Sequence, residues 1–319
     1  MPSQLEILEK TIIAISKVFG KLPEKFTASL AAALGLVVWT LWGSERRRME
    51  DSIDRVYNRL NRKPPMPVKL IVKKSFIHFA LMGSEILRYP SISRQYIERH
   101  FRIKGRENVD KALKKGKGVI MALPHIGNWE YFGAAIVNEG YKLNSFFLAQ
   151  KENEIGSLLD HFRSFSGITL HDRDRGGVKA LKALKNNECL GMITDQDGNA
   201  NGVYMDFLGH WVSMPAGPAN WSIKTGASLI PVFSLRKGYT YNYDAYFLPA
   251  VDANIEGTKE EKTVARTVQL AKWMEELILT YPHQYLWFYD RFKPRHEAWT
   301  TGSININGQM CHGTQRYGK

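Results

Sequence analysis

Between residues 118 and 281, short apolar segments alternate with helix-like stretches, and this alternation constrains the fold more than any other feature. The apolar segments have the length of strands and end at turn residues, whereas the stretches between them are long enough for helices. The predicted strands cover 118–124, 144–149, 189–194, 228–236 and 241–250, and the predicted helices lie near 128–139, 154–166, 177–187, 215–226 and 259–281. This pattern predicts an α/β domain with a central, mostly parallel or mixed sheet flanked by helices.

The run from Phe26 to Gly43 has 18 residues without a charge, which is near the lower limit for a helix that crosses a bilayer. It begins too far into the chain for a secretory signal. Arg46, Arg47 and Arg48 follow it, and its other flank is less basic, so the positive-inside rule places most of the chain in the cytoplasm. We therefore expect an N-terminal membrane-associated helix. A buried or interfacial helix of a soluble protein is the alternative, because the run is short.

Residues 45–63 predict a second helix, which is basic and amphipathic. Ile53, Val56 and Leu60 recur at helical spacing, and arginines occupy the other faces. Such a helix suits anionic lipid headgroups, but the pattern is equally typical of a solvated surface helix. The prolines that follow residue 63 end it.

The chain divides into three predicted parts. Residues 1–64 hold the hydrophobic helix and the basic helix, which together anchor the chain to a membrane. Residues 65–299 form the α/β domain, which begins with a further apolar helix over 68–87. Residues 300–319 are polar and are predicted to form a loosely ordered tail.

The net charge of +13 predicts an anionic partner, namely nucleic acid, an acidic membrane surface, or a phosphorylated or acidic substrate. No zinc-finger or RNA-binding motif occurs in the sequence, which argues against nucleic acid. The only cysteines, Cys189 and Cys311, lie far apart, so neither a disulfide framework nor a thiolate zinc site is supported. The common hydrolase, zinc-protease and nucleotide-binding motifs are absent from the sequence too.

The segment MALPHIGNWE, residues 121–130, contains the strongest candidate for catalysis. His125 follows a predicted strand, and catalytic groups in α/β folds gather at the carboxyl ends of strands. On one continuous helix, His125 and Glu130 would point about 140° apart. The two can therefore meet only if His125 lies in the loop before the helix and Glu130 in its first turns, with Gly127 allowing the bend.

In that arrangement, Glu130 accepts a hydrogen bond from one ring nitrogen of His125 and fixes the tautomer. The other nitrogen is then free to act as a general base toward a substrate hydroxyl. The alternative is a purely structural pair, in which the histidine caps the helix and the glutamate stabilises its N-terminal dipole.

The sequence resembles the bacterial lipid A biosynthesis acyltransferase family, the late lauroyl and myristoyl transferases of lipopolysaccharide assembly, within the lysophospholipid acyltransferase-like superfamily. The mark of this family is a His, four residues, then Asp or Glu, and HIGNWE fits it. The resemblance extends from about residue 26 to 295 through KENE around Asn153, the DQDG turn at 195–198, VYMDFLG at 203–209, SLIPVFSLR at 228–236 and YPHQYLWFYDRFKPR at 281–295.

The resemblance implies acyl transfer from an acyl carrier protein thioester to a hydroxyl of a lipid A precursor at the cytoplasmic face of the inner membrane. His125, oriented by Glu130, would deprotonate the acceptor hydroxyl, which attacks the thioester directly without an acyl-enzyme. No cofactor other than the thioester donor is expected. The basic net charge suits both an acidic carrier protein and an anionic glycolipid acceptor.

Several further residues are predicted to bind substrate, and one departs from the family. Where the family often has an arginine before Asn153, this chain has Lys151, which keeps the charge but loses the bidentate fork. Arg173 suits a phosphate of the donor or acceptor, or is a surface charge beside Asp172. The predicted substrate contacts are Asn128, Lys151, Asn153, Arg173, Asp195, Arg291 and Lys293.

No metal is predicted, because Asp195 and Asp197 have no neighbouring histidine and are typical of a residue pair that closes a turn. Two alternatives to the lipid A function are open. The first is an acyltransferase that acts on another glycolipid, such as a mannosylated phosphatidylinositol, or that uses acyl-CoA. The second is a basic membrane-surface binding protein without catalysis.

Overall fold

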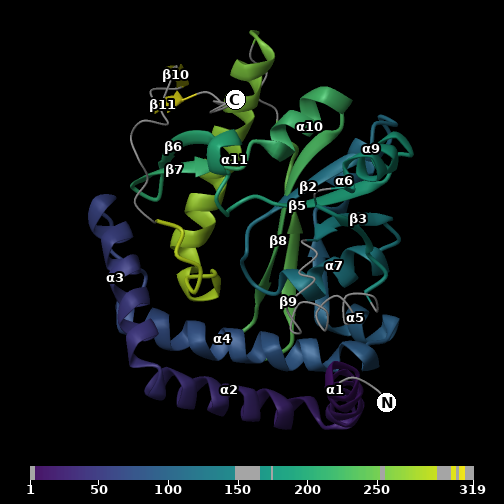
Figure 1. The fold of residues 1–319 in the computed structure, drawn as a ribbon, viewed down its shortest axis with the longest axis vertical. Coiled ribbons are helices and arrows are strands. Elements are labelled where there is room, and N and C mark those ends of the chain that lie inside the picture. Colours follow the sequence, from purple (N-terminus) through teal and green to yellow (C-terminus); the bar gives the residue numbers. More distant parts are fainter. Residues whose placement is uncertain are drawn as a thin grey trace.

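The computed structural model of the chain describes residues 4–147, 166–173, 175–251, 256–292, 303–306 and 309–312. Its centre is a seven-stranded sheet in the order β1-β9-β8-β2-β5-β3-β4 (Figure 1). The strands are β1 (Phe101–Lys104), β2 (Val119–Leu123), β3 (Leu143–Phe147), β4 (Thr169–Asp172), β5 (Cys189–Ile193), β8 (Ser228–Arg236) and β9 (Tyr243–Phe247). Strands β8, β2, β5, β3 and β4 are parallel, and β9 and β1 run the opposite way. The predicted mostly parallel or mixed sheet is confirmed.

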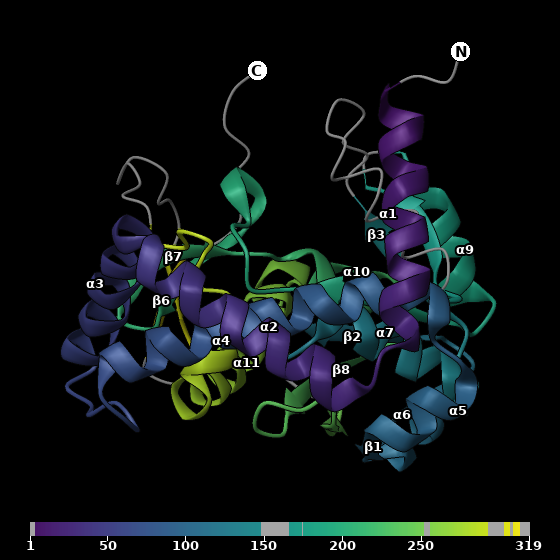
Figure 2. The same ribbon diagram turned by 90° about the horizontal axis from the view of Figure 1, so that it is seen from below.

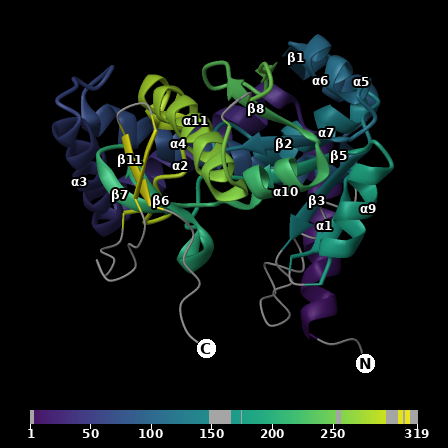
Figure 3. The ribbon, with the colours of Figure 1, turned by 90° about the horizontal axis from the view of Figure 1, so that it is seen from above.

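Helices cover both faces of this sheet, as the apolar sequence of β2 requires. The residues from Val119 to Ala122 have no exposed surface, which is typical of a strand buried on both faces. Helices α5, α6 and α7 pack on one face, and α9, α10 and α11 pack on the other (Figure 3). Their bounds are α5 (Arg94–His100), α6 (Arg106–Leu113), α7 (Trp129–Asn138), α9 (Gly177–Lys185), α10 (Gly217–Thr225) and α11 (Lys259–Thr280). The helix predicted near 154–166 lies almost entirely outside the described residues.

Helix α4 (Val68–Arg88) crosses the edge of the sheet at which β2 and β8 end (Figure 1). It was predicted as an apolar helix over 68–87. Eleven of its residues are buried, and they include His78 and Glu85. Polar groups this deep need partners inside the protein, and the site described below supplies them.

Helix α2 (Glu24–Leu41) lies along the outer side of α4, as Figures 1 and 2 both show. Its buried residues are small, and they include Ala28, Ala31 and Gly35. A Cβ at Gly35 would lie 2.7 Å from the Cα of Ile77 on α4, so glycine permits the close approach of the two helices. Within the described residues, α2 is the one helix long and apolar enough to cross a membrane, and 22% of that apolar window is buried.

Helices α1 (Gln4–Lys21) and α3 (Gly43–Arg59) complete the N-terminal part. Helix α1 was not predicted. Helix α3 matches the predicted basic helix, but its apolar stripe does not face outward. Met49, Ile53 and Val56 have no exposed surface and belong to the same core as α11. The amphipathic pattern of α3 therefore reflects packing against the domain, with its arginines on the solvent side.

A second, four-stranded sheet has the order β10-β11-β6-β7. Its strands are β6 (Val203–Phe207), β7 (His210–Met214), β10 (Ser303–Ile306) and β11 (Gln309–His312). Strands β10 and β11 fall within residues 300–319, where the sequence predicted a loosely ordered tail. In this described part of the segment, β11 pairs with the edge of β6 at His312 and Tyr204; the residues of 300–319 other than those of β10 and β11 lie outside the described residues.

Candidate active site

His125 lies in the turn between β2 and α7, at the carboxyl edge of the sheet, as predicted. The segment that follows α11 holds this turn by two backbone hydrogen bonds. The amide of Leu286 donates to the carbonyl of His125 at 3.1 Å, and the amide of Gly127 donates to the carbonyl of Gln284 at 3.1 Å. Gly127 has a φ of 64°, and a Cβ there would lie 1.8 Å from the carbonyl oxygen of Ser234. Only glycine fits at this bend, which confirms its predicted role.

The ring of His125 is oriented by Asp195, which lies two residues after the end of β5. Nδ1 of His125 lies 2.8 Å from Oδ1 of Asp195, and the backbone amide of His125 donates to Oδ2 at 3.0 Å. A carboxylate can only accept, so Nδ1 carries the proton and Nε2 is left as the basic nitrogen. His125 is 8% exposed and Asp195 is 2% exposed, so little water competes for the pair.

The charge state of Asp195 follows from its surroundings. Burial would raise the pKa of its carboxyl, but the charge of His125 and the two hydrogen bonds from that residue outweigh burial and hold this pKa below its usual value. Asp195 is therefore an anion that faces the imidazole. This is the arrangement that a general base and its orienting carboxylate require.

The predicted pairing of Glu130 with the His125 ring is corrected by this geometry. Glu130 is the second residue of α7, as predicted, but Nδ1 of His125 is bonded to Asp195. Strands β2 and β5 are parallel neighbours, and Leu123 pairs with Ile193, so the turns that follow them meet at one edge. Asp195 was predicted as a substrate contact; its role in the structure is to hold the base.

Arg291 supports Asp195 from behind. Its Nε donates to the Asp195 carbonyl at 2.7 Å, and its Nη2 donates to the Ser213 carbonyl at 2.7 Å. The side chain is 3% exposed, so it holds backbone inside the protein and does not reach out to a substrate phosphate as predicted. Tyr285 lies beside the same carboxylate, and burial together with the charge of Asp195 raises the pKa of its hydroxyl well above the usual value.

A buried polar network lies beneath the His125 turn. Asn128 caps α7 by accepting from the amide of Tyr131 at 3.0 Å, and its Nδ2 donates to Glu85 at 2.9 Å. Glu85 also accepts from the Tyr243 hydroxyl at 2.7 Å and pairs with Arg236 at 2.5 Å. Asn128 has no exposed surface. It was predicted to bind substrate, but it positions the turn instead.

His78 completes this network from α4. Its Nε2 donates to the carbonyl of Gly127 at 3.0 Å, and its Nδ1 accepts from Nε of Arg236 at 3.3 Å. Burial, with a contribution from the charge of Arg236, lowers the pKa of His78 well below 6.5. The native protein therefore keeps this imidazole neutral.

We predict that His78 makes stability sensitive to mild acid. Below a pH of about 6.5 the unfolded chain binds a proton at this histidine and the native state does not, so stability falls with pH by up to about 1.4 kcal/mol per unit. A glutamine can still donate to Gly127, so His78→Gln should lose about 1 kcal/mol less than wild type between pH 7 and pH 5.5 in urea unfolding. His283, whose pKa burial lowers to about 4, titrates in both proteins and cancels. Equal losses in the two proteins would contradict the prediction.

A narrow apolar cavity of about 90 Å³ lies between α7 and the strands β2, β3 and β5. Trp129 and Glu130 line it at the end near His125, and Ile136 of α7 and Leu143 of β3 line it farther away. The Trp129 ring meets the His125 ring edge-on, with centroids 4.8 Å apart. His125 therefore lies beside one end of this cavity.

The other predicted site residues are placed as follows. Arg173 directly follows β4 and so lies at the same edge of the sheet as His125. Lys151, Asn153 and Lys293 lie outside the described residues. Within the described ranges, no group of three His, Cys, Asp or Glu side chains could hold a metal ion.

Three relatives found by comparison with known proteins are all named acyltransferases, of phosphatidylinositol mannoside or of lipid A biosynthesis. A phosphatidylinositol mannoside acyltransferase of Mycobacterium tuberculosis is 29% identical over 174 residues, which cover 53% of this chain and 54% of that protein. The chain thus matches about half the length of this relative. The protein of that name from Mycolicibacterium smegmatis is 27% identical, over 73% of this chain and 76% of its own length. A lipid A biosynthesis acyltransferase 2 of Shigella flexneri is 24% identical, over 86% of this chain and 85% of its own.

The family described as bacterial lipid A biosynthesis acyltransferase matches residues 5–294. This match begins within α1 and ends after Arg291, so it includes both α2 and the segment that clamps the His125 turn. The chain belongs to the bacterial lipid A biosynthesis acyltransferase family.

Proposed function

We propose that this protein transfers a fatty acyl chain from an acyl carrier protein thioester to a hydroxyl of an anionic glycolipid, with a lipid A precursor as the first candidate acceptor. The buried His125–Asp195 pair beside an apolar cavity carries the proposal. It supplies a base for the hydroxyl and, next to that base, a dry space suited to an unbranched hydrocarbon chain.

The reaction uses the free nitrogen of His125. The acceptor hydroxyl gives its proton to Nε2 while its oxygen attacks the thioester carbonyl carbon. When the tetrahedral intermediate collapses, the C–S bond breaks and the thiolate takes the proton from the imidazolium, which leaves an ester and a free thiol. Asp195 stabilises the imidazolium between these two steps. The acceptor oxygen attacks directly, so the mechanism has no acyl-enzyme.

The remaining predicted contacts fit the anionic parts of such substrates. Glu130 lines the cavity end next to the base and is proposed to act there, not on Nδ1 of His125. Arg173 at the same sheet edge, with Lys151, Asn153 and Lys293, is proposed to bind phosphates of the donor or acceptor.

A phosphatidylinositol mannoside is the second candidate acceptor, and acyl-CoA is the second candidate donor. The two mycobacterial relatives named phosphatidylinositol mannoside acyltransferase are 29% and 27% identical to this chain, and the Shigella flexneri relative is 24% identical. Both acceptor classes are anionic glycolipids, so the basic net charge of +13 does not choose between them.

The proposal is tested with the full-length protein and mass spectrometry. Acyl carrier protein and CoA thioesters of one fatty acid are each offered with a lipid A precursor and with a phosphatidylinositol mannoside. We expect one glycolipid to gain the mass of one acyl chain. The productive pair identifies the substrates, and no mass gain with any of the four pairs would contradict acyl transfer to these lipids.

Gly133 on α7 lines the cavity, and we predict that it controls acyl chain length. A Cβ there would lie 2.5 Å from Cδ1 of Ile168, so any side chain fills space that the chain would use. Gly133→Leu should shift the preferred donor to a shorter acyl chain in competition assays, with about tenfold loss for the longest donor. Gly83 on α4 has open space at its Cβ, so Gly83→Leu is the control and should leave the preference unchanged. An unaltered preference in Gly133→Leu would place the acyl chain elsewhere.

We also propose that the protein sits on the inner membrane from the cytoplasmic side, with α2 lying in the membrane surface. Packing of one face of α2 on α4 supports this orientation. The opposite face carries Phe26, Leu30, Leu34, Val37 and Leu41, which are 51% to 80% exposed. A helix with such a stripe lies in the interface with its apolar side toward the acyl chains.

The membrane prediction is checked by sedimentation with anionic vesicles. Replacing Leu30 and Leu34 together by glutamate should lower the vesicle partition coefficient about tenfold or more, because each leucine loses its apolar burial in the lipid. Val178 is 82% exposed on α9, away from α2, so Val178→Glu is the matched control and should bind like wild type. Undiminished binding of the double variant would show that another surface holds the membrane.

A further inference from the structure

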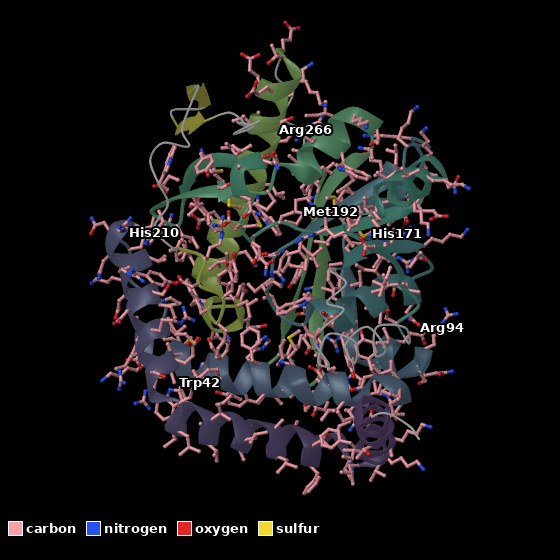
Figure 4. The ribbon with its side chains drawn as sticks, in the orientation of Figure 1. Trp42, Arg94, His171, Met192, His210 and Arg266 are labelled. Carbon is pink, nitrogen blue, oxygen red and sulfur yellow. The ribbon has the colours of Figure 1, made fainter. Side chains whose placement is uncertain are left out.

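A hollow lined by cations lies at the amino ends of β2 and β8, on the side of the domain away from α2. Its volume is about 320 Å³. Three cationic side chains line it, Lys115 before β2 and Lys262 and Arg266 from α11, together with the hydroxyls of Ser222 and Ser228. Among the described residues, no carboxylate lines it. Figure 4 labels Arg266 near α10, far from Trp42 at the end of α2.

Within the described part of the chain, Arg266 has a buried hydrogen-bond donor without a partner. Its Nη1 donates to Oγ of Ser222 at 2.8 Å, and Ser222 in turn donates to the carbonyl of Ala227 at 2.7 Å. Nε of Arg266 is buried and makes no hydrogen bond to any residue that the structure describes. A buried guanidinium N–H without a partner is rare in native proteins and points to a bound water, ion or ligand.

The hydroxyl of Ser228 adds a second donor. It accepts from Nζ of Lys115 at 3.4 Å, and its proton remains available for an acceptor atom. The hollow thus offers an arginine N–H, a hydroxyl and two lysines to one bound group. Phosphoryl oxygens are the acceptors that such a set suits best.

A second cationic hollow of about 420 Å³ adjoins the first. Lys117, Lys185 and Lys224 line it, and the lining residues that the structure describes again include no carboxylate. Two turns contribute residues to both hollows. In the turn between α6 and β2, Lys115 lines the first hollow and Gly116 lines the second. Around the turn between α10 and β8, Gly226 lines the first hollow and Thr225 lines the second. Six cations therefore gather around two adjacent depressions, which fits a ligand with more than one phosphate.

We propose that these two hollows form a binding site for the phosphates of a soluble oligophosphate, separate from the His125 site. The site lies at the amino ends of the parallel strands, whereas His125 lies beyond the carboxyl end of β2. The phosphates can belong to a free oligophosphate or to the nucleotide part of coenzyme A. The proposal stands on the hollows themselves and does not depend on the acyl transfer proposed above.

The test is isothermal titration calorimetry of the full-length protein at constant ionic strength, with inorganic pyrophosphate and with coenzyme A as probes. We expect saturable binding that R266Q weakens at least about tenfold, and R266K less, since lysine keeps the charge but not the fork. Arg94 is exposed on α5, and R94Q is the control that should bind like wild type. If R266Q does not fold, as judged by its thermal melt, K115Q takes its place.

Each outcome bears on the proposal. Coenzyme A bound about tenfold more tightly than pyrophosphate, with both weakened in R266Q, would support the site and identify the nucleotide as its source. Equal affinities would support the site for free oligophosphates. Binding that does not saturate, that R94Q weakens as much as R266Q, or that neither R266Q nor K115Q changes would overturn it.

Discussion

Replacing His125 by alanine should reduce the turnover of acyl transfer by about two to four orders of magnitude. The variant loses the imidazole that Asp195 orients and whose Nε2 is the proposed basic nitrogen, and removal of a general base commonly has this effect. The measurement is single-turnover acyl transfer with the donor and acceptor pair identified by mass spectrometry. Binding of the donor should change little, because His125 is not among the residues that line the cavity. Turnover close to wild type would exclude His125 as the base.

The variant Asp195→Asn, compared with Glu130→Gln, shows which of the two carboxylates orients His125. The asparagine has the same shape, but without the negative charge the imidazolium is less stable, so the acidic limb of the kcat/KM profile should move to lower pH and turnover should fall. Glu130→Gln should move this limb less, because Nδ1 of His125 is bonded to Asp195. A larger shift in Glu130→Gln would restore Glu130 as the orienting residue.

Replacing Arg236 by methionine should destabilise the protein by about 3 to 5 kcal/mol. The guanidinium and the Glu85 carboxylate are 1% and 0% exposed, so the variant leaves a buried charge without its partner. Urea unfolding at pH 7 measures the loss. The double variant Glu85→Gln with Arg236→Met should recover part of it, because the neutral amide no longer requires a cation.

An exposed ion pair gives the matched control for this prediction. Arg62 and Glu276 form a salt bridge in which the side chains are 50% and 64% exposed. Such pairs contribute at most about 1 kcal/mol, so Arg62→Met should unfold at nearly the wild-type urea concentration. If Arg236→Met were as stable as Arg62→Met, the network beneath the His125 turn would not be what holds α4 to the sheet.

The central strands could be predicted because their signal is local. The predicted strand at 189–194 became β5 at Cys189–Ile193, and the predicted 228–236 matches β8, since each apolar run ends at residues that favour turns. Strands β1 and β4 have only four residues each, contain polar residues, and lie at the two edges of the sheet. So short a run does not stand out from loop sequence.

Only the part of the site that one sequence segment contains could be predicted. His125 could be placed at a strand end from one segment, but its partner Asp195 lies 70 residues away. Their meeting depends on β5 lying next to β2, although β3 and β4 come between them in the chain. Glu85 and Arg236 are 151 residues apart and meet for a similar reason. Strand order is a tertiary property, so no spacing in the sequence encodes these pairs.

Residues 284–286 hold the His125 turn by backbone hydrogen bonds, and the ribosome makes them long after the turn itself. The ribosome makes the base, its carboxylate and the cavity well before Gln284, Leu286 and Arg291, which fix the turn and Asp195. Contacts of such long sequence separation form late in folding. A nascent chain stalled before Arg291 therefore holds all the reacting groups but not their alignment. The His125 turn is therefore aligned only after residue 291 has been made, when helices α1, α2 and α3 have long been synthesised.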